Sequence, residues 1–316
     1  MNEENLQQTL SQIDSSDGPT SVLRAGEEKI STGRRVGYFF LSLVPPILCL
    51  ILQVAALLVV LIPKLVFAII SGELDTSNQQ TYVQGYMDLV SNCTSLGVFI
   101  YHIIGIFVFG LWYYLSFRKP RPTMGATIRK TTLQAVLVAV ICGVALCFFS
   151  NGTIIVENTV FPKLVDNYMQ LMEQAGFGVD VFTIIASVIL APIGEEFLCR
   201  GLTLKFAKKS FGKFWIANIL QAFLFGVIHA NWVQGIYAFF IGLVLGYLAE
   251  RYQSLIPCMI LHFVVNFSST TWISVLFDAL FGDEIPNLPV GLAMVIIPTV
   301  IVLALLRKTK KTAEAA

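Results

Sequence analysis

The sequence predicts an all-α, polytopic membrane protein, and three observations carry that prediction. Of the 316 residues, 56% are hydrophobic, only 13% are charged, and the mean hydropathy is +0.74. A soluble domain has about 25% charged residues, so this much apolar surface exceeds what one soluble core can bury. Several uncharged runs also reach the ~20 residues that a membrane-spanning helix needs. These observations exclude a water-soluble enzyme, a disordered chain and a nucleic-acid-binding protein.

The apolar runs predict about eight transmembrane helices. A 36-residue run, Phe214–Ala249, is too long for one crossing, and a turn at Asn231–Gly235 divides it into two helices. Pro45 and Pro46 predict a kink in the first helix, because a proline inside a helix removes one backbone hydrogen bond. The remaining runs, in chain order, are Val36–Pro63, Thr94–Phe117, Thr131–Ser150, Val181–Gly194, Tyr252–Phe277 and Ile285–Leu306.

The basic residues predict the orientation of these helices. If the N-terminal tail is cytosolic, eight crossings place every Lys and Arg except Lys64 and Lys163 on the cytosolic side, which is 19 of 21. The positive-inside rule then predicts that both termini are cytoplasmic. The predicted organisation is a disordered cytoplasmic tail (1–35), a membrane-embedded domain (36–306) and a basic cytoplasmic tail (307–316).

Ionisable residues inside predicted spans are costly and indicate a functional site. Glu195 and Glu196 are adjacent, so their side chains point about 100° apart on a helix. Arg200 follows Glu196 by four residues, the spacing of an ion pair on one face. We expect Arg200 to hold Glu196 and to leave Glu195 free for chemistry. The structural alternative is a helix end with ordinary interfacial charges.

The other polar residues in the predicted spans include His229, His262 and Asn266. A neutral imidazole can bind a metal or polarise a carbonyl, and Asn266 lies one helical turn after His262 as a second possible donor to an oxyanion. The alternatives are a histidine bonded to a backbone carbonyl and an asparagine that only links helices. His102 has no acidic neighbour in the sequence and is interpreted as a packing or interfacial residue.

Three motifs in chain order resemble those of the type II CAAX prenyl endopeptidase family, whose bacterial branch is called CPBP intramembrane proteases. They are E-E-x-x-x-R at Glu195–Arg200, F-x-x-x-H at Phe225–His229 and H-x-x-x-N at His262–Asn266, within residues 180–270. The resemblance implies a membrane-embedded endopeptidase whose site opens to the cytosol. The residues that it implies are Glu195 as the base that activates water, Glu196 and Arg200 as its supporting pair, His229, His262 and Asn266 as polarising groups, and Phe225 as part of the substrate-binding wall.

One feature fits this site poorly. Counted from Phe214 at 1.5 Å per residue, His229 lies more than about 20 Å from the inner surface, deeper than His262. A fifth helix that begins before Phe214, or that tilts, would remove the mismatch.

The metal requirement stays open at this point. Glu195, His229 and His262 could form a three-ligand site for zinc or another divalent metal, and the resembling family is usually labelled a metalloprotease. However, there is no H-E-x-x-H helix. The same residues also work without a metal, with Glu195 as base and His and Asn side chains as donors.

The expected function is therefore hydrolysis of a peptide bond in a membrane-associated peptide or protein, within the lipid bilayer of the cell membrane, or of an ER-type membrane in a eukaryote. Cleavage is expected near the C-terminus of the substrate or close to the membrane on the cytosolic side. One alternative is a proton-coupled transporter that uses Glu195, His229 and His262 as a relay. Another is a non-catalytic bacteriocin-immunity or sensor partner protein.

Overall fold

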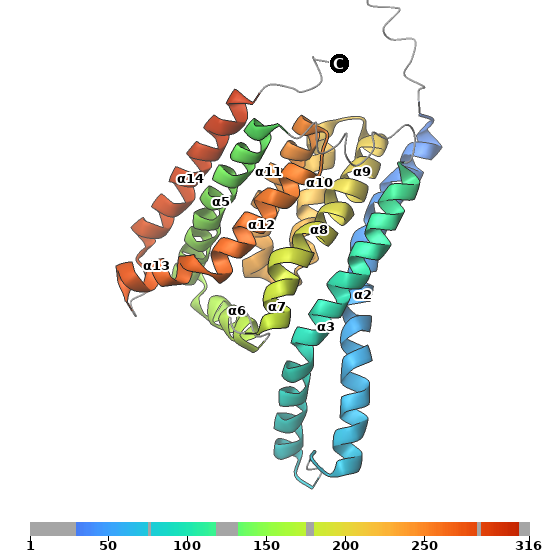
Figure 1. Cartoon of the computed structure of the whole chain (residues 1–316), viewed down its shortest axis with the longest axis vertical. Helices are drawn as coiled ribbons and strands as arrows, with labels where there is room; N and C mark the ends of the chain where they lie inside the picture. Colours follow the sequence, from blue (N-terminus) through green and yellow to red (C-terminus); the bar gives the residue numbers. More distant parts are fainter. Residues whose placement is uncertain (1–29, 75–76, 118–131, 175–179, 283–285, 310–316) are drawn as a thin grey trace, which may run out of the picture.

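The computed structural model describes residues 30–74, 77–117, 132–174, 180–282 and 286–309, and every regular element within them is a helix (Figure 1). The all-α prediction is therefore confirmed for this part of the chain. The α-helices are α2 (Thr32–Ser71), α3 (Gln79–Ser116), α5 (Leu133–Val160), α6 (Pro162–Gln174), α7 (Val181–Ile185), α8 (Ala191–Glu196), α9 (Leu204–Phe211), α10 (Phe214–Val227), α11 (Trp232–Tyr252), α12 (Ile256–Thr270), α13 (Trp272–Phe281) and α14 (Leu288–Lys308). Two π-helical stretches, η2 (Ala186–Leu190) and η3 (Phe197–Thr203), join α7, α8 and α9 into one helical run.

Six helical segments among the described residues are long and apolar enough to cross a membrane. They are α2, α3, α5, the run from α7 to α9, α11 and α14. A bent pair, α12 with most of α13, would make a seventh. The helix expected as the remaining crossing is α10, whose 14 residues are about 21 Å long. Because the hydrocarbon core is about 30 Å thick, α10 alone falls short of it. The chain is a multi-pass membrane protein, and its described residues contain six or seven candidate crossings, so the predicted count of eight stays a prediction.

The prediction of one helix over Tyr252–Phe277 is wrong. The chain leaves α11 through Gln253, whose φ of 48° is left-handed. Helix α12 then begins with Pro257 in its first turn. A proline is tolerated there, because the N–H groups of the first turn have no partner within the helix. At its other end the Thr270 hydroxyl bonds back to the Asn266 carbonyl, and the chain bends by 49° into α13. Local backbone chemistry therefore divides an apolar run that composition alone cannot divide.

Helix α2 begins, and α9 and α14 end, at the same end of the molecule (Figure 1). We call this the basic end, because Lys208 and Lys209 lie in the last turn of α9 and Arg307 and Lys308 in the last turn of α14. At this end Arg35 donates to two carbonyls of the last turn of α9, at Ser210 (2.7 Å) and Phe211 (2.9 Å). A cation is favourable there, since the C-terminus of a helix carries partial negative charge.

The predicted tails are only partly tested. Helix α2 already includes Thr32–Arg35, so the assignment of residues 32–35 to a disordered tail is wrong. Residues 1–29 and 310–316 lie outside the described residues. Helices α2 and α3 also extend far beyond the predicted spans Val36–Pro63 and Thr94–Phe117. Together they form a hairpin that projects past the other helices, away from the basic end (Figure 1).

The run from Val181 to Phe211 carries both glutamates and is fixed at its start by Asp180. One carboxylate oxygen of Asp180 accepts the Thr183 amide (2.9 Å) and the Ser95 hydroxyl of α3. These hydrogen bonds lower the pKa of Asp180 below its ordinary value. Because its pKa is lowered, the Asp180 carboxylate stabilises the fold at neutral pH. This stabilisation is lost as the pH falls through the lowered pKa. Asp180 thereby anchors the glutamate-bearing run to α3.

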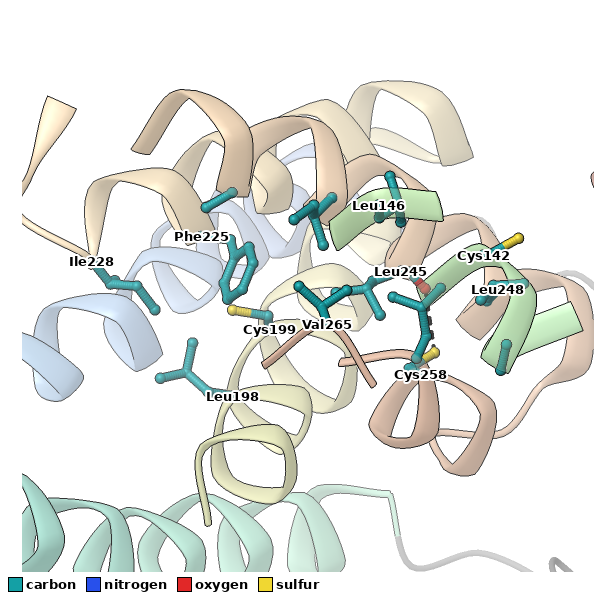
Figure 2. Close-up of a cluster of buried hydrophobic side chains, with 14 of the residues drawn as sticks. Cys142, Leu146, Leu198, Cys199, Phe225, Ile228, Leu245, Leu248, Cys258 and Val265 are labelled. Atoms are coloured by element: carbon teal, nitrogen blue, oxygen red, sulfur yellow. Dashed lines mark hydrogen bonds between the residues drawn. The ribbon is translucent and has the colours of Figure 1, made fainter. Parts of the chain in front are cut away.

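Helices α10 and α11 form a hairpin that glycines allow to close. A Cβ atom on Gly226 would lie 2.6 Å from the carbonyl oxygen of Gly235. The same hairpin is joined by buried amides, since Asn218 donates to the Leu243 carbonyl (3.0 Å) and Gln221 to the Gly242 carbonyl (2.9 Å). The hairpin packs on the main hydrophobic core, part of which is drawn in Figure 2. The core includes Phe225 and Leu245 from the hairpin, Cys199 from η3 and Cys258 from α12.

We expect Gly226→Ala to destabilise the protein, because the added methyl group meets backbone that cannot rotate away. Overpacking of this kind costs about 1–3 kcal/mol. Gly105→Ala on α3 is the matched control, since its Cβ would have only ordinary contacts of 3.6 Å and longer. Thermal unfolding in detergent should show a lower midpoint for Gly226→Ala alone. Equal midpoints for both variants would show that the hairpin is loosely packed.

Candidate active site

Arg200 and Glu196 form a fully buried ion pair. Arg200 Nη1 lies 2.9 Å from Glu196 Oε1, and the side chains of both residues are 0% exposed. Arg200 Nη2 donates to the Gly242 carbonyl (3.3 Å), and the guanidinium lies 4.4 Å from the centre of the Phe225 ring. The pairing predicted from the four-residue spacing is therefore confirmed, and it is tied to α10 and α11 as well.

His262 links this ion pair to the other glutamate, Glu195. Its Nδ1 lies 2.9 Å from Glu196 Oε1, and its Nε2 lies 3.7 Å from Glu195 Oε2. A carboxylate paired with Arg200 can only accept, so Nδ1 carries the hydrogen and Nε2 of a neutral ring presents a lone pair. The ring thus connects the supporting carboxylate to the one expected to perform chemistry.

Glu195 is the less constrained of the two glutamates. Its side chain is 13% exposed, whereas that of Glu196 is 0% exposed. In the described part of the chain, Glu195 Oε2 is buried and has no hydrogen-bond partner. A buried carboxylate oxygen without a partner is unfavourable, and each such group in a native structure requires an explanation. A proton acceptor kept free for a reacting water is one such explanation.

The sequence suggested that His229 lies inside a transmembrane helix, but His229 lies in the turn after α10. The helix ends here because Ala230 adopts a left-handed φ of 52° and Asn231 caps the start of α11. His229 Nδ1 lies 2.7 Å from the Phe225 carbonyl, which can only accept. The Nε2 atom of neutral His229 therefore also carries a lone pair.

Phe225 lies against three residues of the site. Its ring meets His229 at 5.0 Å and His262 at 5.8 Å between ring centres, both edge to face, and it also contacts Arg200. Phe225 is only 2% exposed, so most of its surface is used in these contacts. Its role in binding substrate stays a prediction, and its observed role is to fix two imidazoles and a guanidinium.

Asn266 donates from Nδ2 to the backbone carbonyl of Ser187 (2.8 Å). Ser187 lies in η2, where each carbonyl accepts from the residue five positions later. For Ser187 that residue is Pro192, which has no N–H. Asn266 thus satisfies a carbonyl that Pro192 leaves unpaired, three residues before Glu195. This is the interhelical link considered as the alternative role for Asn266, and its second N–H leaves the role of oxyanion donor as a prediction.

A double variant separates these two roles of Asn266. Asn266→Ala leaves the Ser187 carbonyl unpaired, which costs about 1–3 kcal/mol. Adding Pro192→Ala restores an N–H to this turn of the helix, so the thermal midpoint should recover. We expect hydrolytic activity to stay low, because the second amide N–H is still missing. If activity recovered together with stability, Asn266 would serve only to link the two helices. Pro192→Ala by itself is the control.

The mismatch in depth between the histidines has a structural cause. Helix α10 does begin at Phe214, as assumed. Helix α12, however, begins further from the basic end than α10 does. Its position is shown by Leu255, the residue before α12, whose side chain would lie 3.5 Å from a Cβ on Gly201. Gly201 precedes Phe211 by ten residues, so α12 begins about 15 Å in from the basic end. His262, seven residues further, therefore reaches the depth of His229, near the middle of the run from Val181 to Phe211.

His102 is the residue of this region that the sequence interpretation missed. It is 7% exposed, and its electrostatic interactions are with Glu195, His229 and His262. All three histidines of the chain therefore lie in the region of Glu195. The sequence offered only the number of histidines as a signal, because the contact that brings α3 to Glu195 is tertiary.

The side chains proposed for a metal do not meet as ligands. Within the described residues, no three His, Cys, Asp or Glu side chains are grouped so that they could hold a metal ion. Glu196 Oε1 is shared by Arg200 and His262, and a guanidinium next to the site disfavours a second cation. The arrangement of Glu195, His229 and His262 thus does not fit a three-ligand site.

Comparison with known proteins finds one family that part of the chain resembles. Residues 177–268 match the family model described as Type II CAAX prenyl endopeptidase Rce1-like. The predicted family resemblance is confirmed. This Rce1-like segment spans well under half of the chain and contains both glutamates, Arg200, His229, His262 and Asn266, whereas His102 lies outside it. No curated protein and no solved structure matches the chain.

Proposed function

We propose that the protein is an intramembrane endopeptidase in which Glu195 activates water for peptide hydrolysis. The observation that carries this proposal is the buried chain of contacts from Arg200 through Glu196 and His262 to Glu195. In it, only Glu195 combines a partly exposed side chain with a carboxylate oxygen that no donor occupies. The Rce1-like segment supports the same class of reaction.

The proposed reaction begins when Glu195 accepts a proton from water and the water oxygen bonds to the peptide carbonyl carbon. The tetrahedral intermediate then breaks its C–N bond, and the proton held by Glu195 passes to the leaving nitrogen. Arg200 and Glu196 hold the His262 ring in orientation through Nδ1. The second N–H of Asn266 is the proposed donor to the oxyanion, and the lone pair on His262 Nε2 accepts a hydrogen bond from the attacking water.

Substrate access is proposed from the basic end. A depression in the surface there is lined by Arg200, Lys205, Lys208, Glu250 and Ser254, among others. It therefore extends inward as far as the residue that supports Glu196. A substrate segment entering from this side would approach the glutamates from the cytosol, if the positive-inside rule sets the orientation.

We expect single cysteines to verify that orientation. Lys308→Cys at the basic end should react with a membrane-impermeant reagent only after cells are opened, and Asn167→Cys on α6 should react in intact cells. Both positions are exposed, and the six natural cysteines are buried. Labelling of Lys308→Cys in sealed cells would reverse the orientation and place the access route outside.

The proposed function is tested with purified protein in lipid nanodiscs and a set of membrane-anchored peptides. Mass spectrometry should detect two fragments, with the same yield in the presence of a chelator. Loss of cleavage on chelation, restored by added zinc, would show that a metal takes part. Proton-coupled flux in sealed vesicles without any fragment would identify a transporter instead.

A further inference from the structure

His102 lies on the face of α3 that crosses the residue before the catalytic pair. A Cβ on Gly194 would lie 3.4 Å from the Ile106 side chain and 3.9 Å from the His102 carbonyl oxygen. His102 and Ile106 are four residues apart, so they occupy one face of α3. The absence of a side chain at Gly194 lets this face approach the helix directly beside Glu195.

The geometry of α8 then directs Glu195 toward the boundary between two helices. Successive residues turn by about 100°. Gly194 faces α3, and Glu196 faces His262 on α12, so Glu195 points between α3 and α12. This placement agrees with the electrostatic interaction of Glu195 with His102 on one side and its approach to His262 on the other.

His102 differs from the other two imidazoles in its hydrogen bonding. His229 and His262 both have Nδ1 engaged, at the Phe225 carbonyl and at Glu196, and so present lone pairs. The His102 ring contacts the ring of Tyr101, with ring centres 4.6 Å apart, and among the described residues no hydrogen bond engages either of its ring nitrogens. A neutral imidazole always carries one N–H. His102 is therefore the ring that has a donor available for Glu195.

We propose that His102 is a positioning residue that holds the free carboxylate of Glu195 through a ring N–H. This inference rests on the proposed role of Glu195 and extends it, since His102 lies outside the Rce1-like segment. A carboxylate with a single donor keeps one oxygen directed at the water while it remains a proton acceptor. The site then consists of one base, one donor ring on α3 and two acceptor rings.

The first test needs no substrate. Because the chain has three histidines, isotope labelling of histidine side chains gives three sets of imidazole NMR signals, which single His→Gln variants assign. We expect Glu195→Gln to shift the signals of His102 as strongly as those of His262. Glu250→Gln, which removes the partner of Lys208 at the basic end, is the control and should leave both unchanged. An unchanged His102 signal in Glu195→Gln would overturn the proposal, whatever the enzyme cleaves.

The second test compares two replacements of His102 in the cleavage assay. His102→Gln keeps an N–H donor and should retain kcat within about tenfold, whereas His102→Leu should lose about 10- to 100-fold in kcat with little change in KM. Equal losses in both variants would show that the residue only packs. If His102→Leu does not fold, the NMR comparison in Glu195→Gln decides the question.

Discussion

Replacing Glu195 by glutamine is expected to lower the cleavage rate by a factor of about 10² to 10⁴, the usual contribution of a general base. Glutamine keeps the shape of the side chain but cannot accept a proton from water. Because Glu195 makes no ion pair with Arg200, the variant should fold and bind substrate normally. Steady-state kinetics and thermal unfolding of the purified variant measure both expectations.

The matched control for this variant is Glu250→Gln, which also removes one carboxylate but lies at the basic end in a partly exposed pair with Lys208. It should cleave at the wild-type rate. Cleavage by Glu195→Gln at the rate of this control would remove Glu195 from the mechanism and leave the conspicuous pair of glutamates without a chemical role.

The second large effect is expected on stability, from Arg200→Ala. Glu196 is then left as a buried carboxylate without its cation, a loss of about 3–5 kcal/mol. The contact of the guanidinium with Phe225 is lost as well, which adds up to about 2 kcal/mol. Expression yield and the unfolding midpoint should both fall, and cleavage should fall further because Glu196 no longer orients His262 in the same way.

Two further variants separate the buried charge from ordinary charge effects. Lys208→Ala breaks a partly exposed ion pair in the same helical run and should cost about 1 kcal/mol or less. Arg200→Met combined with Glu196→Gln removes both charges and should recover much of the stability, since no unpaired ion remains. A fully stable Arg200→Ala would show that Arg200 does not support Glu196.

The sequence was most informative where a contact depends on spacing along one helix. Arg200 reaches Glu196 because four residues make one helical turn, so this pair could be predicted before any fold was known. The motif order around Glu195, His229 and His262 likewise pointed to one site, and the structure brings them to a common depth. The all-helical character followed from composition alone.

The remaining features depend on contacts between helices that no spacing reveals. Asn266 bonds to Ser187, 79 residues away, because of a proline on a different helix. His102 lies next to the residue before Glu195 only because Gly194 lets α3 approach closely. Apolar length also predicted α10 as a full crossing, whereas the turn at Ala230 ends it early. Such tertiary contacts explain why His102 was interpreted as a packing residue.

The most direct measurement of the central claim is hydrolysis in ¹⁸O-labelled water by wild-type protein and Glu195→Gln, side by side in nanodiscs. The mechanism predicts that single-turnover cleavage by the wild type places one ¹⁸O atom in the new C-terminal carboxylate of the fragment, and that the variant yields almost no fragment. Unlabelled fragments, or labelled fragments in equal yield from Glu195→Gln, would contradict a water activated by Glu195.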